Sequence, residues 1–143
     1  MELMVVIAIV GILSAVSWGI LAGARKSSDA KNACEQVASM INKTRNYALS
    51  GKTFKNGAVV VVPTVFTATV SGQTVTITND KSVSPETFSI PNSVTCGASL
   101  SFAFSAPYGT CSGCGSPSTP INCSVSGGAT RTVTVTPNSA VCN

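Results

Sequence analysis

The first 24 residues are apolar almost without interruption. A single charged side chain, Glu2, stands at the start of a run that continues from Leu3 to Ala24. As an α-helix this run would rise about 33 Å, at about 1.5 Å per residue, which is enough to cross the hydrocarbon core of a bilayer. A carboxylate at the head of such a run is costly without a counter-charge, so it implies a partner. Residues 1–24 therefore predict a transmembrane helix.

After residue 24 the pattern becomes that of an amphipathic helix. Apolar residues recur at steps of three, four and seven between residues 27 and 50, and Gly51 supplies a stop. Because no proline separates this segment from the apolar run, we expect residues 25–51 to continue the first helix as one rod of about 50 residues. The positions expected to be buried are Ala30, Cys34, Val37, Ile41 and Ala48, flanked by Ala33, Met40 and Tyr47.

From residue 52 onward, β-branched residues are broken by turn formers. Strands are expected at residues 74–78 and 130–136, where alternation of apolar and polar positions, clearest in 74–78 and 132–136, is typical of strands with one wet face. Residues 71–73 predict a hairpin turn, and Pro63 is expected to end a strand. Residues 105–129, rich in Gly and Pro, predict a long exposed loop. Further strands are expected at residues 58–62, 65–70, 87–90 and 100–104.

The expected fold class is α+β, with a long N-terminal helix packed on a C-terminal antiparallel sheet. Three parts are predicted: a membrane helix at residues 1–24, an amphipathic stalk at 25–51 and a β-rich head at 52–143. With 10% charged residues, no histidine and six cysteines, the composition is typical of an exported protein. Histidine is the commonest acid–base group near neutral pH, so its absence disfavours an enzyme, and no cofactor is expected.

Charge is placed unevenly. Basic residues crowd the stretch after the apolar run, whereas from residue 82 onward the only charged side chains are Glu86 and Arg131. Under the positive-inside rule, Arg25 and Lys26 would keep the following part in the cytoplasm. A basic leader that is cut away after insertion would reconcile this with an exported, cysteine-rich head. The basic cluster could also bind nucleic acid, but without interleaved aromatic residues a solvated stalk surface is favoured.

The six cysteines form an even set, which allows fifteen pairings. Disulfides are the default in a small exported head, where each typically contributes about 2–4 kcal/mol. The CxxC spacing of Cys111 and Cys114 also suits a thiol redox site, or a zinc site completed by Cys123 and Cys142. The disulfide candidates are Cys34, Cys96, Cys111, Cys114, Cys123 and Cys142.

Residues 1–13, Met-Glu-Leu-Met-Val-Val-Ile-Ala-Ile-Val-Gly-Ile-Leu, closely resemble the N-terminal segment of type IV pilins and type II secretion pseudopilins. Residues 25–51 are similar, more loosely, to the stalk helix of H-type minor pilins and pseudopilins. The family's glutamate stands fifth in the mature chain, whereas here it is second. The resemblance therefore implies that three more residues, including the methylated phenylalanine, precede it.

This resemblance implies a structural subunit that waits in the inner membrane through residues 3–24 and then polymerises into a filament on the cell surface. Glu2 would neutralise the N-terminal amine of a neighbouring copy and set the axial register. Gly11, Gly19 and Gly23 mark the stretch expected to unwind in the filament, since glycine costs a helix about 1 kcal/mol relative to alanine. The implied partners are a platform protein, a motor ATPase and a prepilin peptidase.

Several alternatives stay open at this level. The apolar segment could be a cleaved signal or an ordinary single-pass anchor in which Glu2 lies at the interface. Within the resembled family, the chain could instead be a minor pilin or pseudopilin that primes or tips a filament for type II secretion or DNA uptake. An adhesin or DNA-binding module is a further alternative, for which Arg131 is the available basic residue of the C-terminal part.

Overall fold

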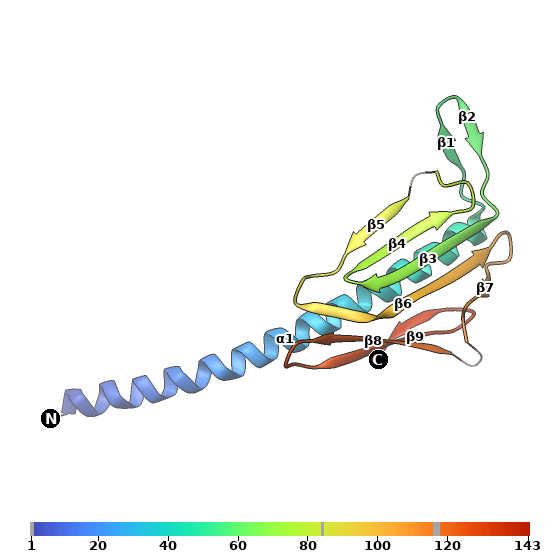
Figure 1. Cartoon of the computed structure of the whole chain (residues 1–143). Coiled ribbons are helices and arrows are strands. Elements are labelled where there is room, and N and C mark those ends of the chain that lie inside the picture. Colours follow the sequence, from blue (N-terminus) through green and yellow to red (C-terminus); the bar gives the residue numbers. More distant parts are fainter. Residues whose placement is uncertain (1, 84, 116–117) are drawn as a thin grey trace.

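A computed structural model describes the backbone of residues 2–83, 85–115 and 118–143. Within these ranges, the side-chain surroundings of residues 2, 3, 5, 16–20, 56 and 98 lie outside the description. Figure 1 shows a long helix that emerges from one end of a β-rich head as a rod. The α+β class, the long N-terminal helix and the antiparallel sheet predicted from the sequence are confirmed.

Helix α1 spans Glu2–Ser50, 49 residues, and its backbone is helical throughout. The next residue is Gly51, whose φ of 59° is a left-handed conformation that glycine adopts without strain and that stops the helix. The Lys52 N–H then donates to the Tyr47 carbonyl at 3.0 Å, which satisfies one of the last carbonyls of the helix. The predicted stop is therefore confirmed, and the chain continues into strand β1.

One face of the second half of α1 is buried against the head. The predicted positions are confirmed as buried, and small side chains dominate, so the sheet can approach the helix closely. Thr44 is a polar exception within this face: it is 0% exposed, and its hydroxyl donates to the Met40 carbonyl at 2.8 Å. The buried residues of this face are Ala30, Ala33, Cys34, Val37, Ala38, Ile41, Thr44 and Ala48.

The head consists of a large antiparallel sheet and a separate hairpin. The order of strands in the large sheet is β10-β9-β8-β6-β3-β4-β5, with β7 also paired to β6. Strands β1 and β2 form the separate two-stranded sheet. The strands are β1 Phe54–Asn56, β2 Val59–Val61, β3 Val65–Gly72, β4 Thr74–Asn79, β5 Glu86–Ser89, β6 Val94–Ser105, β7 Thr110–Ser112, β8 Thr119–Val125, β9 Thr130–Val135 and β10 Ala140–Cys142.

Strand β6 pairs with three other strands of the large sheet. One of its sides pairs with β3, while the other pairs with β8 through Val94–Cys96 and with β7 through Ala103–Ser105. The face of the sheet toward α1 carries the core, including Phe66 on β3 and Phe102 and Phe104 on β6. Because side chains alternate along a strand, the intervening Ser and Thr residues form the wet face.

The prediction of a long exposed loop at residues 105–129 is wrong, because this segment contains β7 and β8. Ile121, Cys123 and Val125 are buried while the residues between them are exposed, the period-two pattern of a strand with one wet face. The strand is not predicted from the sequence because Gly and Pro residues flank this short alternation of buried and exposed positions. Pro120 lies next to the start of β8, in the part of the strand that pairs with β9 and not with β6, so one side of its backbone needs no N–H for strand pairing.

Candidate functional site

The first half of α1, residues 2–24, is here called the apolar half, and it projects beyond the head (Figure 1). Every side chain described between residues 4 and 26 is exposed, including Met4 at 78%, Ile7 at 62% and Ile12 at 67%. Residues 6–15 are exposed consecutively, so apolar side chains cover the whole circumference of the rod. Within the side chains described, no helix carries an apolar run long enough to cross a membrane.

The four residues predicted to act in assembly all belong to the apolar half. Glu2 lies at the first turn of α1, and its side chain is outside the described part of the structure, as are the surroundings of Gly19. A Cβ added at Gly11 or Gly23 would meet nothing within 4 Å. Packing within one chain therefore does not require glycine at these two positions. Pairing of Glu2 and unwinding at the glycines stay predictions about the assembled state.

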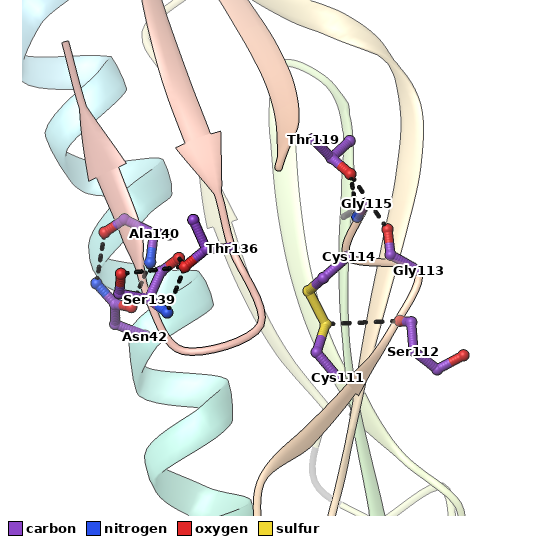
Figure 2. Close-up of a disulfide and its surroundings, with 10 residues drawn as sticks. All are labelled: Asn42, Cys111, Ser112, Gly113, Cys114, Gly115, Thr119, Thr136, Ser139 and Ala140. Atoms are coloured by element: carbon purple, nitrogen blue, oxygen red, sulfur yellow. Dashed lines mark hydrogen bonds between the residues drawn. A yellow bond between two sulfur atoms is a disulfide. The ribbon is translucent and has the colours of Figure 1, made fainter. Parts of the chain in front are cut away.

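All six cysteines are joined in disulfides, so none keeps a free thiol. Cys96–Cys123 links two directly paired residues of β6 and β8. The CxxC pair forms the short-range disulfide Cys111–Cys114, shown in Figure 2. With its sulfur atoms bonded in this way, the pair is not arranged as a zinc site.

The third disulfide, Cys34–Cys142, ties α1 to the edge strand β10 across 108 residues of sequence. Asn42, two turns further along the helix, binds the same strand through both atoms of its amide group. Its Nδ2 donates to the Ala140 carbonyl and its Oδ1 accepts from the Ala140 N–H, each at 2.8 Å (Figure 2). The Asn42 side chain thus provides hydrogen-bond partners for the N–H and C=O groups of Ala140, which an edge strand would otherwise leave without a partner.

At the opposite edge of the sheet, a cluster around Glu86 of β5 makes a second connection to α1. The Glu86 carboxylate accepts hydrogen bonds from Lys43 Nζ at 2.5 Å, Tyr47 Oη at 2.9 Å and Lys52 Nζ at 3.3 Å. Lys52 Nζ also lies 3.5 Å from the centre of the Tyr47 ring. The Lys43 hydrogen bond lowers the pKa of Glu86, and partial burial opposes this.

Both edge strands of the large sheet are therefore attached to one helix. Asn42 and Lys43 are neighbours in sequence but point to different flanks of α1, because successive helical residues are about 100° apart. Neither attachment was predicted from the sequence. Only two weak sequence features point to the Glu86 cluster. Lys43 and Tyr47 are four residues apart on one helix flank, and Glu86 is the only acidic residue after Asp80 in the sequence.

Arg131, the candidate for nucleic-acid contact, lies on β9 opposite Cys123 of β8. The residue is half-buried, and its Nε atom is buried without a hydrogen-bond partner. Most of the other basic side chains lie on α1, which contacts β9, and one of them, Lys26, reaches the Ser126 carbonyl in the turn before that strand at 3.3 Å. Contact of Arg131 with nucleic acid stays a prediction.

Among the described residues, no three Cys, Asp or Glu side chains gather in a metal-binding arrangement.

No protein-family model, no curated protein and no solved structure matches this chain. A function for it must therefore be inferred from the chain's own residues and geometry.

Proposed function

We propose that this chain is a structural subunit of a type IV pilus-like extracellular filament, polymerised through the apolar half of α1. The observation that carries the proposal is the exposure of that half: every side chain described there lies bare outside the head. Such a surface is unfavourable in water and marks a contact with lipid or with other protein. The apolar halves of α1 in further copies of the chain would cover this surface with equally apolar side chains.

Before assembly, the apolar half would be stored in the inner membrane. Its transfer from lipid to a bundle of apolar helices costs little, because both surroundings are apolar. The sequence resemblance supplies the remaining steps, in which a peptidase trims the leader and a motor ATPase with a platform protein extracts the subunit. The head, held to the second half of α1, would then lie on the filament surface.

Glu2 would select the correct axial step between neighbouring helices. A carboxylate buried among apolar side chains without a partner is strongly unfavourable, whereas an ammonium group within hydrogen-bond distance offsets that cost. The N-terminal amine of an adjacent copy is such a group. A helix displaced along the filament axis would leave both charges unpaired, which disfavours the wrong register.

We expect Glu2→Ala to reduce the yield of surface filaments about tenfold or more, since about 1.4 kcal/mol per contact already corresponds to a factor of ten. The yield would be measured by shearing cells that express the full chain and imaging the released material. Glu35→Ala is the matched control, because Glu35 also lies on α1 and its side chain is exposed, in an ion pair with Lys31 at 3.8 Å. Normal polymerisation of the Glu2→Ala chain would overturn the proposal.

A second candidate within the same class is a minor subunit that primes or tips a filament. The similarity of residues 25–51 to the stalk of H-type minor pilins favours it. The amount of the chain in sheared filaments separates the two roles, because a fibre-forming subunit is the bulk component and a priming subunit is scarce.

A further inference from the structure

Strands β1 and β2 form a hairpin, residues 54–62, that is here called the valine hairpin; in the described part of the chain it pairs with no other strand. The two strands are joined at Gly57, whose φ of 63° suits a tight turn. Figure 1 shows the hairpin projecting from the head at the end away from the apolar half of α1. It is an appendage and not part of the large sheet.

Both faces of the valine hairpin expose apolar side chains. Val59 is 65% exposed on one face, while Val60 at 57% and Val62 at 58% lie on the other. A surface strand usually carries polar side chains on its outer face, and a bare apolar hairpin is an aggregation hazard. Two-stranded hairpins are also only marginally stable alone in water. These features are typical of a surface that is covered in an assembly.

The base of the hairpin is fixed to the head. Phe54 packs near Phe66 of the core, with ring centres 6.3 Å apart, and Lys52 Nζ lies 5.0 Å from the Phe54 ring. At the other end, the Thr64 N–H and hydroxyl donate to the Asp80 carboxylate at 3.1 Å and 2.9 Å. A contact made by the hairpin therefore needs little ordering of its base, which favours binding.

We infer that the valine hairpin docks onto the apolar half of α1 of a second copy of this chain. This inference rests on the proposed function. The hairpin and the apolar half lie at opposite ends of the molecule, so they cannot meet within one chain (Figure 1). A contact between two unlike surfaces is heterologous and repeats from copy to copy, which generates an open filament unless the rotation closes a ring.

The charges of the two surfaces are compatible with this contact. In residues 51–62 the only charged side chains are Lys52 and Lys55, and in the apolar half the only one is Glu2. No like-charge pair therefore opposes the approach of one surface to the other. Val59, Val60 and Val62 can meet the isoleucine and valine side chains that the rod exposes around its circumference.

Cysteine cross-linking tests the contact directly. Because all native cysteines are in disulfides, a cysteine introduced at Val60 carries the only free thiol of its copy. Copies with Val60→Cys would be co-expressed with differently tagged copies carrying Val6→Cys, Ile9→Cys or Ile12→Cys, and sheared filaments treated with a short bis-maleimide. We expect a product containing both tags for at least one helix position. Thr87→Cys, at an exposed site on β5, is the control that should give none.

The outcomes separate this inference from the proposed function. Normal filaments without a cross-link from Val60 to any of the three helix positions would overturn the docking contact and leave the filament proposal standing. Products joining Val60 to Val60, or to a different protein, would also overturn it. If the unmodified chain forms no filaments, the proposed function fails and the docking contact fails with it.

A second measurement uses polar substitutions of the same shape. The double variant Val60→Thr/Val62→Thr alters two exposed side chains, so the head should fold as before, whereas the filament yield should fall about tenfold because apolar contact area is lost. Val141→Thr, at a 51% exposed valine of β10, is the matched control and should leave the yield unchanged. An unchanged yield for the double variant would count against the docking contact.

Discussion

Glu86 shows how one carboxylate can fix the edge of a sheet. It lies on the helix-facing side of β5, opposite Ile77 of β4, where it receives Lys43, Tyr47 and Lys52 from α1 and the turn after it. The hydrogen bond between Lys43 and Glu86 lowers the pKa of the carboxyl and raises the pKa of the amine. Each group thereby stabilises the charged form of the other.

The direction of the Glu86 pKa shift predicts an acid-dependent stability. A carboxyl whose folded pKa lies below its unfolded value stabilises the fold above the unfolded pKa, and this contribution is lost as pH falls through the folded pKa. At neutral pH we expect Glu86→Gln to lower the free energy of unfolding by about 1 kcal/mol, a modest value because the side chain is 34% exposed. The difference between the two proteins should shrink below about pH 4.

Urea unfolding at pH 7 and pH 3 would measure this difference. Glu35→Gln serves as the control, since the Glu35 side chain is 56% exposed and its ion pair with Lys31 is weak. A destabilisation by Glu86→Gln of equal size at both pH values would show that the carboxylate charge is not what holds β5.

At the level of elements, α1 is one helix with two different environments. From Ala30 onward its buried face is lined mainly by alanine and other small or medium side chains, which the sheet covers. Before Ser27, its described side chains are exposed. The disulfide Cys34–Cys142 lies about one helical turn beyond Ala30 and joins the helix to the last strand.

The three disulfides should differ in their contributions to stability. On the chain-entropy model, Cys34–Cys142, with a sequence separation of 108, is worth about 5 kcal/mol, whereas Cys111–Cys114, with a separation of 3, is worth about 2 kcal/mol. We expect Cys34→Ala/Cys142→Ala to reduce the free energy of unfolding by more than Cys111→Ala/Cys114→Ala. Denaturant unfolding without reductant would measure both, and equal losses would contradict the expectation.

For the whole molecule, the head and the apolar half are energetically separate. The sheet wraps the second half of α1 and is tied to it at both edges, by Asn42 and Cys34 on one side and by Glu86 on the other. The side chains described before Ser27 are exposed, with Lys26 reaching the Ser126 carbonyl at 3.3 Å. We therefore expect folding of the head not to depend on the apolar half.

Removal of residues 1–24 tests this separation. We expect the shortened chain to be a soluble monomer with its free energy of unfolding unchanged within about 0.5 kcal/mol, as for surface changes that remove no buried contact. Sedimentation would give the association state and thermal unfolding the stability. A substantial drop in the unfolding temperature would show that the apolar half supports the head.

Much of the fold could be predicted because it is encoded in short-range periodicity. The buried face of α1 was visible in the spacing of Ala30, Cys34, Val37 and Ile41, and most strands in the alternation of valine and threonine. Strand β8 was missed because its three buried residues stand among Gly and Pro. Thr44 was missed because a hydroxyl bonded to its own helix can occupy an apolar stripe.

The sequence by itself determined the long helix, its two kinds of surface and the antiparallel sheet, since these follow from which neighbouring residues are apolar. Only the tertiary structure decided the disulfide pairing, the Asn42 and Glu86 attachments and the separation of the valine hairpin from the large sheet. Asn42 and Ala140 are 98 residues apart, and Lys43 and Glu86 are 43 apart. Contacts at such separations depend on how the whole chain packs, which no local pattern specifies.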